Sequence, residues 1–393
     1  MQDLPSMMLW LYLLILPLMS FCVKTGENVT LDKIWAPIIR ENKTCPRFIL
    51  VDIGIDGMGD QIERLIMGLA LAVKHKGFSV VLTERLGKSI HDVSDSYYEV
   101  YHDILSLPIF PLMSEIIKRY PRKKIKRRLL TQEKYLSYLR GELDMAAIEP
   151  CYSLLDVDIY DVCGIWCPFV MGWEVQKVVK PLLRDAFAAR GKAYCADYLG
   201  RSRNNALVMQ HAQASFDASK ALNVVWHVRH PSLSTDESRI VCYSCTAGYF
   251  SKISNFIAEN SGRKSVFHTV VTNSNQSQLK YEQERYQALL GNNARVLIGG
   301  LKESICTALS ADILITTGST FFSSLKLFTP RYRPLLIEEQ RHNRMIQDPK
   351  IKFKWFTAPG DAWHMVNGTM LPLVSSRGEH LELRSILGER LEA

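Results

Sequence analysis

Segments typical of strands and of helices alternate regularly through the second half of the sequence, and this alternation restricts the fold more than any other feature. Apolar runs rich in β-branched residues predict five strands, at 222–229, 265–271, 294–298, 312–316 and 334–338. Helical spacing of apolar residues predicts the helices between them, at 247–259, 278–290, 303–309 and 321–328. Strands separated by helices form one parallel, doubly wound sheet, and such sheets bind ligands beyond the carboxyl ends of their strands.

A turn of small residues follows the fourth of these strands. Thr317, Gly318, Ser319 and Thr320 lead from the strand into a helical segment that begins with Phe321. Unpaired amide groups and the helix dipole make such a helix start attractive to an anion, for example a phosphate. An ordinary strand–helix turn, capped by Ser319 or Thr320, is the alternative interpretation.

Two polar residues end the first strand of the same predicted sheet. Arg229 is its last residue, so we expect it to face the same crevice as the turn at 317–320. His227 lies on the same face of the strand as Arg229, because side chains alternate along a strand. The alternatives are a surface ion pair for Arg229 and a hydrogen-bonded core position for His227.

The first half of the chain opens with a strand–helix–strand unit. Residues 47–53 and 78–82 predict strands, and the helix between them has one apolar face. The turn before this helix contains Gly57, Gly59, Asp60 and Gln61. Its glycines are not spaced as in a dinucleotide-binding loop, but they allow a ligand or another backbone to come close. Asp60 is also a candidate for the helix N-cap.

No regular pattern extends over residues 91–167, and Pro181 interrupts a predicted helix at 175–190. Within the irregular part, residues 118–128 contain eight lysines and arginines. A solvated, mobile loop is the plainest interpretation, and the alternatives are a patch for an acidic acceptor, for anionic lipid or for another protein. The net charge of +8 fits an anionic ligand. Nucleic acid is not an expected partner, because no aromatic-interleaved fold surrounds the basic residues.

The amino terminus predicts entry into the secretory pathway. Residues 7–23 form an almost unbroken apolar run without charge, so residues 1–23 are interpreted as a signal peptide or a signal anchor that holds the protein in the membrane if uncleaved. The polar residues 24–45 then predict a stem. Four sequons agree with a luminal location in the Golgi or endoplasmic reticulum, at Asn28, Asn42, Asn275 and Asn367.

Eight cysteines follow Cys22, an even number that permits disulfides in an oxidising compartment. The pairs Cys163/Cys167 and Cys242/Cys245 have a spacing that also occurs in zinc sites, but no paired histidines follow them, so we expect no metal. Cys306 lies in a predicted helix and is interpreted as a buried thiol.

Three motifs in the order found here resemble those of GDP-fucose-dependent fucosyltransferases of the α1,2/α1,6 superfamily, which includes bacterial nodulation and protein O-fucosyl enzymes. They are the turn at 57–61, the Trp-His-Val-Arg run at 226–229, and residues 311–321. The resemblance implies a GT-B fold, in which two Rossmann-like domains with parallel doubly wound sheets face each other. Their bounds here are 46–205 for the acceptor side and 206–345 for the nucleotide-sugar side, and 346–393 form a C-terminal segment with a terminal helix.

The resemblance also implies roles for single residues in a luminal, metal-independent glycosyltransferase without a cofactor. Arg229 contacts the donor pyrophosphate and, with His227, is the candidate catalytic residue. The donor phosphates are also held by the late turn, through Thr317, Gly318, Ser319 and Thr320. The acceptor, a glycan or glycoprotein, lies near Gly57, Gly59, Asp60 and Gln61. Ser232 stands where the family usually has an aspartate, so an inactive glycan- or nucleotide-binding relative and an enzyme for another nucleotide sugar remain alternatives.

Overall fold

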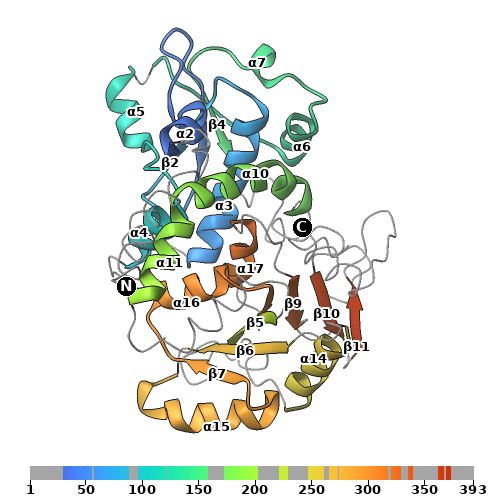
Figure 1. The fold of residues 1–393 in the computed structure, drawn as a ribbon. Helices are drawn as coiled ribbons and strands as arrows, with labels where there is room; N and C mark the ends of the chain where they lie inside the picture. Colours follow the sequence, from blue (N-terminus) through green and yellow to red (C-terminus); the bar gives the residue numbers. More distant parts are fainter. Residues whose placement is uncertain are drawn as a thin grey trace, which may run out of the picture. The chain divides into compact units, whose positions relative to one another are not determined.

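A computed structural model shows how the chain folds (Figure 1). It describes residues 30–54, 57–87, 96–121, 123–157, 172–201, 221–228, 247–260, 265–272, 274–316, 320–328, 335–339, 362–366 and 369–372. From Leu31 onward the chain forms one unit by its internal contacts. The predicted leader at 1–23 lies outside the described residues.

Four parallel strands form the first sheet. They are β1 (Phe48–Val51), β2 (Ser79–Leu82), β3 (Lys126–Leu129) and β4 (Ser153–Val157), in the order β2-β1-β4-β3. The helix α3 (Met58–Lys74) connects β1 to β2, as the sequence predicts. It packs closely on β1 at Gly68, where a Cβ atom would lie 2.2 Å from Cγ2 of Val51. Gly77 ends the crossover with a φ of +91°, a conformation that glycine adopts without steric cost.

The two faces of the first sheet are covered differently. Ile49, Val51 and Val80 belong to the large core that includes residues of α3 and of α10 (Gly172–Ala186). Phe48 and Leu50 point to the opposite face, in a smaller cluster with α5 (Met113–Arg119). This alternation is the period of two that a strand covered on both faces requires.

The helix α2 (Leu31–Ile39) falls within the predicted stem and corrects it in part. Trp35 and Ile38 of α2 are buried in the large core, and the Trp35 indole donates a hydrogen bond to the carbonyl of Ser106 at 3.0 Å. A stem would leave such side chains in solvent. The part of the chain that packs on the first sheet therefore begins at α2. The free energy gained by burying the Trp35 and Ile38 side chains explains why this otherwise polar segment packs on the core.

The region 91–167 contains two strands that the sequence does not reveal, β3 and β4. β3 has four residues, all exposed, and three of them are basic, so it has neither apolar alternation nor an apolar run. The interpretation of residues 118–128 as a mobile loop is therefore wrong for residues 126–128, which belong to β3. α10 also runs through Pro181 without a break in its helical assignment. The other helices that the structure describes in this half are α4 (Ser96–Glu99), η2 (Val100–Ile104), α6 (Gln132–Arg140), α7 (Met145–Ile148), η4 (Phe187–Gly191) and α11 (Lys192–Arg201).

The second sheet contains the five predicted strands in parallel. They are β5 (Ala221–Val228), β6 (Ser265–Thr272), β7 (Ala294–Leu297), β8 (Ile313–Thr316) and β9 (Leu335–Glu339), in the order β9-β8-β5-β6-β7. Two further strands extend the β9 edge, β10 (Ala362–Val366) in parallel and β11 (Thr369–Pro372) antiparallel. The predicted C-terminal segment 346–393 thus adds to this sheet, and its predicted terminal helix lies outside the described residues.

Helices cover both faces of the second sheet, which makes it doubly wound. Val224 and Trp226 of β5 pack with α14 (Ala247–Asn260) and α15 (Leu279–Leu290). Val225 packs on the opposite face, in the core with α16 (Leu301–Leu309), α17 (Thr320–Ser324) and η8 (Leu325–Leu327). A short 3-10 helix, η7 (Gln276–Gln278), precedes α15. The predicted α/β fold with two parallel sheets is confirmed.

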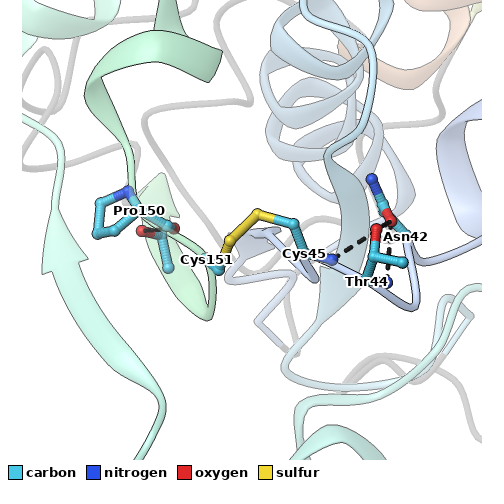
Figure 2. The surroundings of a disulfide bond; sticks show 6 residues. Asn42, Thr44, Cys45, Pro150 and Cys151 are labelled. Atoms are coloured by element: carbon cyan, nitrogen blue, oxygen red, sulfur yellow. Dashed lines mark hydrogen bonds between the residues drawn. A yellow bond between two sulfur atoms is a disulfide. The ribbon is translucent and has the colours of Figure 1, made fainter.

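In the described part of the chain, two disulfides join segments that are distant in sequence. Cys45 is bonded to Cys151, which connects the segment before β1 to the segment before β4 (Figure 2). Cys195 of α11 is bonded to Cys306 of α16. Cys306 is therefore not the free buried thiol that its helical position suggests. The pairs Cys163/Cys167 and Cys242/Cys245 lie outside the described residues.

Candidate functional site

The order of strands in the second sheet places its ligand crevice between β5 and β8. The chain builds the sheet from β5 through β6 to β7 on one side, and then returns to add β8 and β9 on the other side. The order therefore reverses between β5 and β8, and open α/β sheets bind ligands at the carboxyl ends of the strands on either side of such a reversal. At this end of the two strands, His227 of β5 pairs in register with Thr316 of β8.

The predicted donor residues follow these two strands in the sequence. Arg229 comes directly after Val228, the last residue of β5, and Thr317 comes directly after Thr316, the last residue of β8. Arg229 and the turn residues Thr317, Gly318 and Ser319 themselves lie outside the described residues, as does Ser232. Thr320 is the first residue of α17. Strand order thus brings the ends of β5 and β8 side by side, as the expectation of one shared crevice requires.

His227 is held by an aromatic contact at this crevice. Its ring is stacked on the ring of Phe322 in α17, with centroids 3.6 Å apart and planes inclined by 14°. Phe322 is buried, and His227 is half-buried. The contact joins the end of β5 to the helix that follows the late turn. His227 thus packs on a buried aromatic ring, whereas the alternative in the sequence analysis was a hydrogen-bonded core position.

The segment after the late turn has the apolar face that the sequence predicts, but α17 is short. It is five residues long and continues as the 3-10 helix η8. Phe322, Leu325 and Phe328 are buried, in agreement with their helical spacing. Lys326 in η8 is only 2 % exposed, which the sequence did not indicate. Because a buried ammonium group requires polar partners, Lys326 is a further candidate for a role near this site.

On the first sheet, the predicted acceptor turn leads into α3. Gly57 is the N-cap residue, and a Cβ atom there would meet no atom within 4 Å. Gly59 and Asp60 lie inside the helix, so Asp60 does not cap it. Gln61 is fully buried, and its Oε1 accepts a hydrogen bond from the Gly87 amide at 3.0 Å. Gln61 therefore ties α3 to the loop after β2, which is a structural role.

A carboxylate that the sequence analysis missed lies at the carboxyl end of β1. Asp52 Oδ1 accepts hydrogen bonds from the Thr83 hydroxyl at 2.9 Å and from the Gly54 amide at 3.2 Å. Arg64 of α3 donates to the Asp52 carbonyl at 3.3 Å. These contacts fix the start of the acceptor-side turn from three directions. An acid directly after an apolar strand was the signal in the sequence.

The helices that follow the two predicted turns are packed against each other. α17, which follows the late turn, contacts α3, which follows the early turn (Figure 1). Phe322 and Ile62 belong to the same continuous core. The two halves of the predicted site are therefore connected through side-chain packing, although the motifs are about 260 residues apart in sequence.

Two of the four predicted glycosylation sites, Asn42 and Asn275, are among the described residues, and both are exposed. Asn42 is exposed, and its Oδ1 accepts hydrogen bonds from the Thr44 amide, the Thr44 hydroxyl and the Cys45 amide at 3.1, 2.7 and 3.3 Å (Figure 2). Asn275 is also exposed and accepts a bond from the Ser277 amide. Asn28 and Asn367 lie outside the described residues. In the part of the chain that the structure describes, no three metal-ligating side chains gather, and no helix has the length and apolarity that would let it cross a membrane.

The chain is similar to known proteins only among solved structures. No protein-family model and no curated protein matches the sequence. Among solved structures, NodZ alpha-1,6-fucosyltransferase co-crystallised with GDP matches at 18% identity and a TM-score of 0.37, over 75% of this chain and 95% of that chain. POFUT1 in complex with GDP matches at 14% identity and 0.36, over 74% and 97%. An Arabidopsis thaliana FUT1 mutant with GDP matches at 11% identity and 0.36, over 87% and 81%. The similarity to these fucosyltransferases extends over about three quarters or more of this chain. At such TM-scores it gives no role to any single residue of this chain.

Proposed function

We propose that this protein is a glycosyltransferase that transfers fucose from GDP-fucose to a glycan or glycoprotein acceptor, without a metal ion. The observation that carries the proposal is the reversal of strand order between β5 and β8. β5 and β8 lie on either side of this reversal, and in the sequence Arg229 directly follows β5 and Thr317 directly follows β8. The turn was predicted to hold an anion from its residue types, and Arg229 was assigned to the donor pyrophosphate by the family resemblance.

The chemistry of sugar transfer requires those residue types. When the glycosidic bond breaks, negative charge develops on the β-phosphate of the nucleoside diphosphate leaving group. A guanidinium group can hold two phosphate oxygens at once, and the hydroxyls and amides of a small-residue turn add further donors. Groups aimed at developing charge stabilise the transition state more than the ground state, which is the condition for faster reaction.

The acceptor would approach from the first sheet. Gly57 leaves open space at the start of α3, and Asp52 and its hydrogen bonds hold the turn before it. Contact between α3 and α17 keeps the two turns in one structural unit. We propose a luminal location, because the apolar leader, the sequons and the disulfides all favour it. Expression in a secretory host should give a mass shift that an N-glycosidase removes.

A panel of nucleotides tests the donor directly. We expect GDP to raise the melting temperature in the presence of EDTA, and by linkage a ligand at about a hundred times its Kd adds roughly 2.7 kcal/mol of apparent stability. A shift with UDP and none with GDP would contradict the choice of donor. Because Ser232 replaces the family's usual aspartate, hydrolysis of GDP-fucose must be measured as well. Binding without hydrolysis or transfer would mean a glycan- or nucleotide-binding relative.

A further inference from the structure

A cavity of about 330 Å³ lies at the amino-terminal ends of β1 and β2, the opposite end of the strands from the site described above. Phe48 and Ser79, the first residues of these strands, line it together with residues around the end of α2 and in α5. Figure 1 shows α2, α5 and β2 close together. Its volume is within the range of small-molecule sites, roughly 300–1,000 Å³.

The part of the cavity wall that a ligand can reach is apolar on one side. Ile39 and Pro111 line the cavity and are half-buried, so they offer apolar surface to a ligand. Phe48 and Ser79 also line it, but they are only 0 % and 1 % exposed and contribute little accessible surface.

Cations surround the opening of the cavity. Arg40 and Lys43 line it and are exposed, and Arg119 lines it in an ion pair with Glu41 at 2.7 Å. Three cations and one carboxylate leave the lining with a charge of +2. The cavity therefore suits a ring with an apolar face and hydroxyl groups that carries an anionic substituent at the opening.

A row of four lysines in the sequence leads from α5, which lines the cavity, through the turn after it to the first residue of β3. Lys118, Lys123, Lys124 and Lys126 are all exposed, and none forms an ion pair with another residue in the described ranges. The neighbouring arginines differ, because Arg127 pairs with Asp156 and Arg128 with Glu149. Lysines on an edge strand also prevent pairing with other chains, but only Lys126 of the four lies on β3.

Aromatic contacts connect the cavity to this row of lysines. The Tyr120 ring lies 6.0 Å from that of Phe48 in the cavity wall and 5.7 Å from that of Tyr152. The Lys124 ammonium group lies 5.7 Å from the centre of the Tyr152 ring. The lysines and the exposed cations of the cavity are thus linked through one aromatic cluster, and we call them together the basic edge surface: Arg40, Lys43, Lys118, Lys123, Lys124 and Lys126.

We propose that the basic edge surface binds a sulfated polysaccharide, with one sugar unit in the cavity and the sulfates of the following units along the lysines. A linear polyanion matches a row of unpaired lysines. A sugar ring fits the cavity and its apolar wall, which a flat anionic membrane would leave empty. This binding site is separate from the proposed donor site and does not depend on it.

The test compares two variants with the same change in charge. Wild-type protein should bind heparin-type polysaccharide at physiological salt, and Lys123→Glu/Lys124→Glu/Lys126→Glu should weaken binding about tenfold or more, with a shallower dependence on salt. The control Lys33→Glu/Lys177→Glu/Lys280→Glu alters three exposed lysines on α2, α10 and α15 and should weaken it less than about threefold. Equal losses in the two variants would overturn the proposal.

Two further measurements test the class of ligand and the cavity. Polyglutamate and phosphatidylserine vesicles should bind at least about tenfold more weakly than the polysaccharide, and equal binding would overturn the proposal. Arg40→Ala/Lys43→Ala should weaken the binding of a sulfated tetrasaccharide about threefold or more, while unchanged affinity would remove the cavity from the site. The melting shift with GDP should be the same in all these variants, which separates failure here from failure of the proposed transferase function.

Discussion

The ring of His227 stacks on the ring of Phe322 with 3.6 Å between centroids, and this contact joins the carboxyl end of β5 to the helix that follows the late turn. The two residues are 95 positions apart in the sequence. Arg229 follows His227 by two residues in the sequence, and Thr317 to Ser319 directly precede α17, so we propose that the stack helps to position both donor segments. Aromatic pairs contribute about 0.5–1.5 kcal/mol beyond the area that they bury.

We predict that Phe322→Leu weakens nucleotide binding more than an equally destabilising change elsewhere. Both Phe322→Leu and the control Phe250→Leu remove a buried ring, but Phe250 packs against Trp226 on the other face of the sheet. Each should cost about 1–2 kcal/mol in urea unfolding. Only Phe322→Leu should raise the Kd for GDP, by about fivefold or more, because small misplacements of binding groups are costly. Equal Kd values for the two variants would contradict a positioning role for the stack.

Arg229 is the residue on which we expect transfer to depend most. Arg229→Lys keeps the charge but loses the planar fork, so the rate of transfer should fall by about two to three orders of magnitude while the protein stays folded. His227→Ala should lower the rate less and the stability more, since His227 packs on Phe322. The measurements are single-turnover transfer from GDP-fucose and thermal unfolding. A near-normal rate in Arg229→Lys would rule out the donor-site assignment.

Removal of the Cys195–Cys306 disulfide should destabilise the protein strongly. The two cysteines are 111 residues apart, and closing a loop of this length lowers the entropy of the unfolded chain by an amount worth about 4–5 kcal/mol. The matched control is Cys45→Ala/Cys151→Ala, with a separation of 106 residues, which should cost a similar amount. Urea unfolding of both double variants gives the comparison, and non-reducing peptide mapping checks the pairing. A free thiol at Cys306 would refute the assignment.

Stability should fall with acid because of His268. Burial lowers the pKa of His268 to about 4, and its Nδ1 accepts a hydrogen bond from the Trp226 indole at 3.1 Å. In the unfolded chain the imidazole becomes protonated below about pH 6.5, whereas in the folded protein it stays neutral down to about pH 4. Between these two pH values the unfolded state therefore binds more protons than the folded state. Stability from this group is complete above pH 6.5 and is lost progressively as the pH falls toward 4, by roughly 3 kcal/mol in total.

The variant His268→Gln tests this pH dependence. A glutamine keeps an acceptor for Trp226 but has no proton to take up, so the slope of unfolding free energy between pH 6.5 and 4 should decrease. His102→Gln is the comparison, because burial also lowers the pKa of His102, at a position on the first-sheet side of the chain. An unchanged slope in His268→Gln would show that other groups cause the loss in acid.

Local sequence determined most of the second sheet and the apolar face after the late turn. Each of the five predicted strands is an apolar run, and a helix period follows each of the first four. Burial on both faces makes such a run recognisable without knowledge of its neighbours. Only tertiary structure could decide that β5 lies beside β8, because strand order depends on long-range pairing. The same holds for the stack of His227 on Phe322 and for the bond between Cys195 and Cys306. β3 was not predicted, for the opposite reason. All its residues are exposed and three of them are basic, so its sequence has no apolar alternation. Its strand conformation is defined by backbone pairing with β4, which the sequence does not show.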